Sequence, residues 1–267
     1  MQSILKTSID EYMSKPAHAV APTDLLASVY KRLLETNVSC LAVVDGDSLV
    51  GVVSRTDLLR AGRRQATPTS DAADARHVLL EFSPTPVAEV MTHTVDLVSP
   101  TTSIAAASAI MSEQHVHRVF VGSKESLLGV FSTLDVMRVI RDGVAKEPIS
   151  EFMSAPIEVV DVEETVAKAV DQLEKSHVSG LIAVENEWPV GVFTQVEALA
   201  ARDLEDDTLV EDAMDPALIC MPVTTSMHRA AQQALRMRVR RVVASENRHM
   251  RGILSGLDFA RYAALKA

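Results

Sequence analysis

The residues best suited to chemistry lie in the short segment Ser54-Arg55-Thr56-Asp57, which is predicted to open a helix. A helix N-terminus offers free backbone N–H groups and the positive end of its dipole, and both favour a bound anion such as phosphate. The hydroxyls of Ser54 and Thr56 can donate to phosphate, and the carboxylate of Asp57 can accept from two neighbouring ribose hydroxyls. The alternative is that Ser54 and Asp57 only cap the helix, as these residue types commonly do.

Two cationic pairs give a second reason to expect an anion. His117-Arg118 and Arg240-Arg241 each stand directly before an apolar run that is typical of a buried strand. Guanidinium and imidazolium groups form strong hydrogen bonds with phosphate oxygens. The wider run from Arg236 to Arg241 could instead bind nucleic acid, but a net charge of −10 favours a local polyphosphate pocket. His115 and His117 could share a metal, but the sequence offers no third ligand nearby, so no metal site is predicted.

The helix-opening segment belongs to a pattern that occurs four times in the chain, which favours ligand binding over simple capping. A methionine ends a short acidic segment, a glycine follows it after 38 residues, a hydroxyl comes three residues later and an acid three residues after that. The methionines are Met13, Met91, Met153 and Met214, and the glycines are Gly51, Gly129, Gly191 and Gly252. The hydroxyl and acid pairs are Ser54 and Asp57, Ser132 and Asp135, Thr194 and Glu197, and Ser255 and Asp258. Such repeats mean that each copy buries its apolar face only by stacking on a neighbour.

The four copies alternate in sequence, so odd copies resemble odd ones and even copies resemble even ones. The first and third copies carry Val-Ser before the middle strand, at Val38 and Val178, whereas the second and fourth carry the cationic pairs. A duplicated pair explains this alternation, and it divides the chain into two lobes, 1–145 and 146–267. The first interval between copies is longer than the others by residues around Gly62 to Ser83, for which we expect a surface loop and a short helix at 72–82.

A single copy is predicted to form a helix, two strands and a second helix. In the first copy the first helix is expected to start near Pro22, with Thr23 as its N-cap, and to bury Leu26, Val29, Leu33 and Leu34. The strands are expected at 41–44 and 49–53, joined by a turn at 45–47, and the second helix at 54–60. The glycine inside the return strand predicts a close approach by another backbone. A short extended segment at 17–21 precedes the copy.

The composition excludes several functional classes. The chain has 267 residues, 47% of them hydrophobic, but no apolar run long enough to span a membrane. No secretion signal is evident, and the two cysteines, Cys40 and Cys220, are expected to be buried thiols in a reducing cytoplasm. No nucleophile elbow, phosphate-binding glycine loop or zinc spacing occurs, so the chain is not expected to be an enzyme.

With these residues in place, the chain resembles four CBS motifs arranged as two tandem pairs, or Bateman modules. The resemblance covers about Ile9 to Tyr262, and it rests on the order glycine, apolar, any, Ser/Thr, any, Ser/Thr, Asp. Gly51 to Asp57 match this order fully. The other copies depart from it at Leu134, at Leu257, and at Val196 and Glu197. The chain is similar to the nucleotide-sensing subunit of AMP-activated protein kinase, whose His-Arg phosphate-binding pair His117-Arg118 matches.

The resemblance implies an α/β fold in which two pseudo-symmetric pairs form a disc and bind adenine nucleotides between copies. In that family the acid holds ribose and the hydroxyls help to hold phosphate. The implied ligand-binding residues are Ser54, Thr56, Asp57, His117, Arg118, Ser132, Asp135, Arg240, Arg241, Ser255 and Asp258. The implied ligand is AMP, ADP or ATP, with S-adenosylmethionine as a second class, and no catalytic cofactor is implied. The residues that follow each methionine would line the adenine through backbone contacts.

The expected function is that of a stand-alone, cytoplasmic regulatory protein that signals nucleotide binding to an effector protein. The chain would form the disc as a monomer or join a homodimer, and neither a membrane nor nucleic acid is expected as partner. Two alternatives stay open at this point: a scaffold or assembly subunit whose clefts are vestigial, and a regulator associated with nucleic acid through the arginine run.

Overall fold

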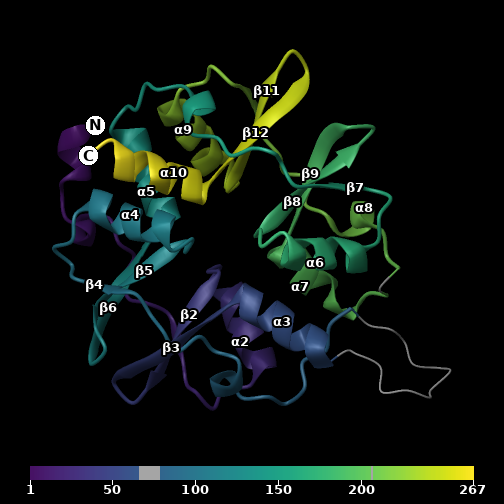
Figure 1. Cartoon of the computed structure of the whole chain (residues 1–267). Helices are drawn as coiled ribbons and strands as arrows, with labels where there is room; N and C mark the ends of the chain where they lie inside the picture. The colour runs from purple at the N-terminus through teal and green to yellow at the C-terminus, as the bar shows by residue number, and fades with distance from the viewer. Residues whose placement is uncertain (66–78, 206) are drawn as a thin grey trace. The chain divides into compact units, whose positions relative to one another are not determined.

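The computed structural model describes residues 1–65, 79–205 and 207–267, and within them the same α/β unit occurs four times (Figure 1). Each copy runs from a short strand through a helix and two longer strands into a second helix. The first copy comprises β1 (Ala19–Val20), α2 (Leu26–Glu35), β2 (Cys40–Asp45), β3 (Ser48–Ser54) and α3 (Arg55–Gln65). The second comprises β4 (Leu97–Val98), α4 (Ile104–Glu113), β5 (Arg118–Ser123), β6 (Ser126–Ser132) and α5 (Thr133–Asp142).

The third copy comprises β7 (Val159–Asp161), α6 (Val166–Lys175), β8 (Gly180–Glu185), β9 (Trp188–Thr194) and α7 (Gln195–Ala200), followed by the 3₁₀ turn η4 (Ala201–Asp203). The fourth comprises β10 (Cys220–Pro222), α9 (Met227–Met237), β11 (Arg241–Glu246), β12 (His249–Ser255) and α10 (Gly256–Leu265). Short helical turns precede the copies: α1 (Gln2–Leu5), η1 (Ile9–Glu11), η2 (Val87–Glu89), η3 (Ile149–Glu151) and α8 (Val210–Ala213). The predicted α/β class and the fourfold repeat are confirmed.

Each copy has its own three-stranded sheet with the same register. The short first strand runs parallel to the middle strand, and the middle strand runs antiparallel to the last one. A bulge interrupts the antiparallel ladder next to the glycine, for example between Val43, which faces Gly51, and Val44. The other three copies have the same bulge beside Gly129, Gly191 and Gly252. The repeat register seen in the sequence is therefore a register of sheet pairing.

The glycines are needed because another backbone lies against each last strand, as predicted. A Cβ at Gly51 would lie 2.8 Å from the sulfur of Met91 and 2.9 Å from the carbonyl oxygen of Thr92. At Gly129 it would lie 2.5 Å from the carbonyl oxygen of Ser14. All three distances are shorter than real Cβ contacts, so any side chain here would push the two backbones apart.

The segment that heads each copy is bonded to the last strand of a different copy. Thr92, which follows the methionine that heads the second copy, pairs with Val52 of the first copy through two backbone hydrogen bonds of 2.9 Å. Ser14, which heads the first copy, pairs in the same way with Val130 of the second copy. The third and fourth copies exchange their head segments likewise, through Ser154 with Ile253 and Asp215 with Val192. The exchange is thus reciprocal within copies one and two, and within copies three and four.

The chain folds into two compact units that group the copies differently from their order in the sequence. The even unit (Met1–Ala17, Val95–Ile157 and Ala217–Ala267) holds the sheets and helices of the second and fourth copies. The odd unit (His18–Thr94 and Glu158–Pro216) holds those of the first and third. Like copies therefore pack with like. The division into lobes 1–145 and 146–267 is not tested by this grouping and stays a prediction.

In the even unit, α4, α5, α9 and α10 pack around one apolar core (Figure 1). Phe131, Phe259 and Tyr262 are fully buried there, next to small residues such as Ala107 and Ala234 that let the helices approach closely. Each fully buried large apolar side chain contributes roughly 1.5–3 kcal/mol relative to an exposed one. The odd unit has a separate core formed by the corresponding faces of α2, α3, α6 and α7.

Several predicted boundaries in the first copy were wrong. The first helix begins at Leu26, and Thr23 is not its cap, because the residues before Leu26 are bonded to the head of the second copy: Val87 N–H donates to the carbonyl of Asp24. Leu34 is 50% exposed rather than buried. The second helix extends beyond the predicted Arg60 to Gln65.

The interval after the first copy lies mostly outside the described residues, which include only 79–82 of the helix predicted at 72–82, and these four are not helical. Leu79 and Leu80 are buried, and their N–H groups donate to the carbonyls of Leu204 and Arg202. The expectation of buried thiols was wrong for Cys220, which is exposed at the start of β10, and Cys40 is only partly buried.

Candidate phosphate- and ribose-binding site

The four helix starts singled out by the sequence share one hydrogen-bonding arrangement. In the first copy, Asp57 Oδ2 accepts from both the backbone N–H and the hydroxyl of Ser54, each at 2.7 Å. Asp135 with Ser132, Asp258 with Ser255, and Glu197 with Thr194 repeat this arrangement. Each is a capping box, so the capping interpretation is realised in every copy. A carboxylate has two oxygens, however, and the second oxygen distinguishes the copies.

In the even unit the second oxygen is already occupied. Asp135 is 1% exposed, and its Oδ1 accepts from Arg138 at 2.5 Å. Burial raises the pKa of Asp135, while the hydrogen bonds from Ser132 and the charge of Arg138 oppose that rise. Asp258 is 3% exposed, and its Oδ1 accepts from Arg261 at 3.0 Å and from Ser154 at 2.6 Å. A ribose could use either carboxylate only by displacing a protein donor.

In the odd unit the corresponding acids are more accessible. Asp57 is partly exposed, and among the described residues nothing donates to its Oδ1. The neighbouring hydroxyl of Thr56 is also partly exposed, and the third copy has Val196 at this position. Of the four helix starts, that of the first copy thus combines a free carboxylate oxygen with a second hydroxyl.

The cationic residues of the even unit lie at the starts of the neighbouring strands, opposite the residues that open the helices. β5 begins at Arg118, which faces Ser132, and β11 begins at Arg241, which faces Ser255. The two helix starts that follow are in contact, because a Cβ at Gly256 would lie 2.5 Å from Thr133 Oγ1. The structure thereby brings together His117, Arg118, Arg240 and Arg241, which we call the cationic cluster.

The pKa shifts confirm that these four side chains influence one another. Burial, followed by the charges of Arg118, Arg241 and Arg240 in that order, lowers the pKa of His117 to about 4. Burial and the charge of Arg118 also lower the pKa of Arg240. His117 is therefore neutral at pH 7 beside three guanidinium groups. An anion placed here would lie beside three guanidinium groups and near the positive ends of α5 and α10, and it would favour protonation of the imidazole.

The structure distributes the predicted site residues between the two units. Ser54, Thr56 and Asp57 lie in the odd unit, and the remaining predicted residues lie in the even unit. A single site that combines Asp57 with His117 and Arg118 therefore stays a prediction. Within the described residues no group of His, Cys, Asp and Glu is arranged to hold a metal, and His115 is exposed.

Three residues that matter here were not predicted. Arg138 and Arg261 each stand three residues after the acid that they contact, and this helical spacing could have identified them. Ser154 gave no such signal, because it is 104 residues away from Asp258 in the sequence.

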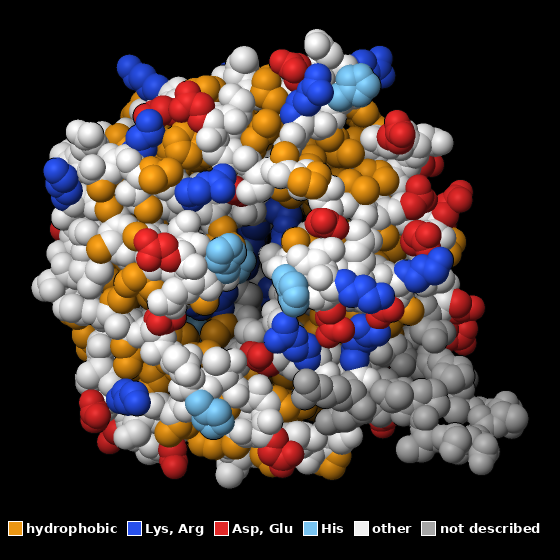
Figure 2. All heavy atoms as spheres, in the orientation of Figure 1, with side chains coloured by type: hydrophobic (Ala, Val, Ile, Leu, Met, Phe, Trp, Pro, Cys, Tyr) orange, Lys and Arg blue, Asp and Glu red, His pale blue; other side chains and the backbone are white. Residues whose placement is uncertain are grey.

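The distribution of charge on the surface gives little further information about the site. On the face drawn in Figure 2, acidic and basic side chains are interspersed among hydrophobic ones, and the negative net charge does not form a single patch there. None of the helices in the described ranges is long and apolar enough to cross a bilayer.

The repeated fold and the helix-start signature define a class of protein. The family model described as CBS domain matches residues 9–64, 87–142, 149–203 and 210–265. The chain belongs to the CBS-domain family, whose domains are regulatory modules, and it contains four of them.

Two solved structures share the fold over 96% of this chain and 99% of their own. One is a Methanocaldococcus jannaschii protein described as a proposed archaeal homologue of g-AMPK, with 16% identity and a TM-score of 0.80. The other is an uncharacterised conserved protein from Pyrococcus horikoshii, with 15% identity and a TM-score of 0.66. A curated relative, an uncharacterised 33.4 kDa protein in a ribosomal RNA operon of Thermofilum pendens, is 24% identical over 74% of this chain. The match spans 65% of that relative's length.

Proposed function

We propose that this chain is a regulatory protein that binds an adenine nucleotide, with phosphate at the cationic cluster of the even unit. The observation that carries the proposal is the convergence of three arginines and a neutral histidine at two touching helix starts. The charge of Arg118 contributes to lowering the pKa of Arg240, and a bound phosphate would be attracted to all three guanidinium groups. The adenine part of the proposal follows the CBS resemblance, with AMP, ADP or ATP as the ligand and S-adenosylmethionine as the second class.

The ribose is assigned first to Asp57. Its Oδ1 can accept from a ribose hydroxyl without displacing a protein group, and Thr56 provides an additional hydroxyl beside it. Asp135 and Asp258 rank after it, because their oxygens already accept hydrogen bonds from arginine or serine. The sites of this chain are therefore proposed to differ in affinity rather than to fill together.

Titration calorimetry of the full chain with AMP, ADP, ATP and S-adenosylmethionine tests this proposal. Arg241→Ala should weaken phosphate-containing ligands by at least tenfold, since a charge-assisted hydrogen bond contributes about 1.5–3 kcal/mol. Arg236→Ala is the matched control, because Arg236 is an exposed arginine of the same run, at the end of α9. Absence of binding by all four ligands, or equal loss in both variants, would contradict the proposal.

The regulatory output is proposed to pass to an effector protein in the cytoplasm. Ligand binding can shift the protein between arrangements only as far as it binds them with different affinity. The reciprocal exchange of head segments supports the pairs 1–145 and 146–267 as the functional modules, because each head lies on its partner's strand. The chain would act as a monomer or a homodimer, and no catalytic step is assigned to it.

A scaffold role is the second candidate, and one observation favours it. The capping boxes of the even unit satisfy Asp135 and Asp258 completely without a ligand. A scaffold would keep its melting temperature unchanged at millimolar nucleotide, whereas a sensor must be stabilised by the ligand that it binds.

A further inference from the structure

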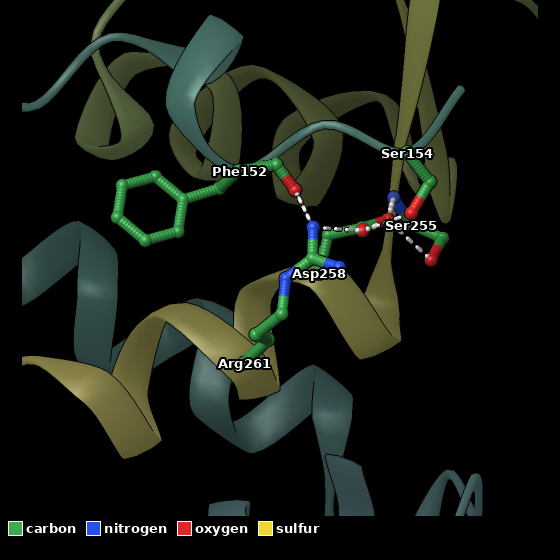
Figure 3. A network of polar contacts seen from close by, with 5 residues as sticks. All are labelled: Phe152, Ser154, Ser255, Asp258 and Arg261. Atoms are coloured by element: carbon green, nitrogen blue, oxygen red, sulfur yellow. Dashed lines mark hydrogen bonds and ion pairs between the residues drawn. The ribbon is translucent and has the colours of Figure 1, made fainter. Parts of the chain in front are cut away.

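The carboxylate of Asp258 is held by donors from three different positions in the fold (Figure 3). Its Oδ2 accepts from the N–H and the hydroxyl of Ser255 at the start of α10, each at 2.7 Å. Its Oδ1 accepts from Arg261, one turn further along α10, and from Ser154 Oγ at 2.6 Å. With four hydrogen bonds the carboxylate has no acceptor position left for a ligand.

Ser154 differs from the other three donors because it does not belong to the fourth copy. Ser255 closes the capping box of α10 and Arg261 stands three residues after Asp258, so these donors belong to the same helix as the acid. Ser154 lies instead in the segment that heads the third copy, where its backbone pairs with Ile253 and its hydroxyl donates to Asp258. Its neutral hydroxyl can be replaced by a ligand hydroxyl of the same kind, whereas replacing Arg261 would lose a charge-assisted hydrogen bond.

The counterparts of Ser154 in the other copies make no such contact. Ser14 occupies the same position against the second copy, but it is exposed, and the second oxygen of Asp135 accepts from Arg138 instead. Thr92 stands opposite the first copy and is also exposed, and no described residue donates to Asp57 Oδ1. Opposite the third copy the position is occupied by Asp215, and a carboxylate accepts hydrogen bonds, so a serine hydroxyl donates to the helix-start acid in the fourth copy alone among the described residues.

The segment that carries Ser154 is also fastened to α10 at further points. Arg261 donates to the carbonyl of Phe152, whose ring packs edge-on against Tyr262 with the centroids 4.9 Å apart. The hydroxyl of Tyr262 donates to Glu147 at 2.8 Å. Residues 147–154 form the connection between the second and third copies. One face of α10 therefore holds both the acid of the fourth site and this connection.

We propose that Ser154 is a latch on the fourth site: it occupies Asp258 in the free protein, and a nucleotide must displace it to bind there. The inference rests on the proposed nucleotide binding, and it adds that occupancy of the fourth site frees the side chain of Ser154 and loosens residues 147–154. Asp57 would fill at lower nucleotide concentration, and the fourth site would respond only at higher concentration. The latch thus gives one chain two sites that respond at different nucleotide concentrations.

Calorimetry with AMP on the wild-type chain, Ser154→Ala and Ser14→Ala tests the latch. Ser154→Ala should bind AMP about tenfold more tightly at one site, because the lost hydrogen bond no longer competes with the ribose. Ser14→Ala should behave as wild type, since its hydroxyl does not contact Asp135. The double variant Ser154→Ala, Asp258→Asn should lose this gain in AMP affinity. Asparagine can still accept the capping hydrogen bonds, so the start of α10 is kept.

The outcomes separate this inference from the proposed function. If the wild type binds AMP but Ser154→Ala gains nothing, or Ser14→Ala gains as much, the latch is wrong and the nucleotide proposal stands. If only Ser154→Ala binds AMP, the latch is supported. If neither the wild type nor Ser154→Ala binds AMP, both the latch and the proposed nucleotide binding are contradicted. Hydrogen exchange without ligand gives an independent measurement: residues 147–154 should exchange faster in Ser154→Ala than in Ser14→Ala, and equal rates would overturn the fastening of the connection.

Discussion

The even and odd units are built from the same repeat, yet they use its helix-start acids differently. In the even unit Asp135 and Asp258 are almost fully buried, and both oxygens of each are hydrogen-bonded. In the odd unit Asp57 and Glu197 are partly exposed, and from the described residues they accept the capping hydrogen bonds alone. The cationic cluster also belongs to the even unit, since the odd copies have Ser39 and Ser179 where the even ones have His117 and Arg240.

This difference shows that the same pattern of hydroxyl and acid can cap a helix in two different environments. The pattern of hydroxyl and acid closes a capping box wherever it occurs, and whether it can also bind a ligand depends on the neighbours of the second oxygen. In the even unit an arginine three residues later takes that oxygen, whereas Arg60 of the first copy is exposed. The acids of the two units thus differ in burial and in the partners of their second oxygen, which the following variants can test.

The largest difference in stability between the units is expected when the helix-start acids themselves are replaced. Asp135→Ala should lower the free energy of unfolding by about 3 kcal/mol, because it removes a buried capping box and leaves Arg138 without its partner. Asp57→Ala should cost about 1 kcal/mol, the usual loss of an N-terminal cap, and should weaken nucleotide binding. Chemical denaturation followed by circular dichroism measures both. Equal losses of stability would show that the units do not differ in this respect.

A smaller effect is expected from the titration of His117. Its pKa in the folded chain is about 4, below the value of about 6.5 in an unfolded chain. The unfolded state therefore binds more protons between these two pH values, and stability falls as the pH is lowered through this window. We expect a loss of about 2 kcal/mol between pH 6.5 and pH 4, after allowance for partial exposure.

The variant His117→Gln should lack this part of the pH dependence, whereas His115→Gln should retain it, because His115 is exposed. Denaturation midpoints at several pH values from 4 to 7 would reveal the difference. If His117→Gln and wild type lose stability in parallel over this range, the histidine is not buried in its neutral form among the arginines.

The smallest effect should come from the arginines that follow the acids. Arg138→Ala should cost roughly 1 kcal/mol, because its partner Asp135 is buried although Arg138 itself is 42% exposed. Arg60→Ala should leave stability unchanged, since Arg60 is exposed and forms no ion pair with any described residue. Thermal denaturation resolves a difference of this size. A measurable loss in Arg60→Ala would mean that the odd unit also restrains its acid.

Much of the fold could be predicted because the same residue types recur at the same positions of the strands and helices in each copy. The glycine register gave the position of every last strand, and the predicted close approach at Gly51 is confirmed by the contact with Met91. The capping alternative at Ser54 and Asp57 was also recognised from the sequence, although its coexistence with an open oxygen was not. The glycine and the capping box can each be recognised within one copy, where spacing along the chain decides which groups meet, although the residue that contacts Gly51 comes from the second copy.

The remaining features depend on contacts that spacing does not encode. Thr23 was predicted as a cap from its residue type, but hydrogen bonds to the head of the second copy delay the helix to Leu26. Ser154 reaches Asp258 only because the head segments are exchanged between copies. The packing of like copies together was equally invisible, since the alternation of the repeats indicated duplication but not which helices share a core.

The assignment of segments to the two units has a consequence for proteolysis. The polypeptide crosses from one unit to the other at residues 17–18, 94–95, 157–158 and 216–217. No single peptide cleavage can therefore release an intact unit, and a nick anywhere between 18 and 216 yields fragments that each lack part of a core. Nicked molecules should stay associated until denaturant is added, and fragments produced separately should recover structure only when they are mixed.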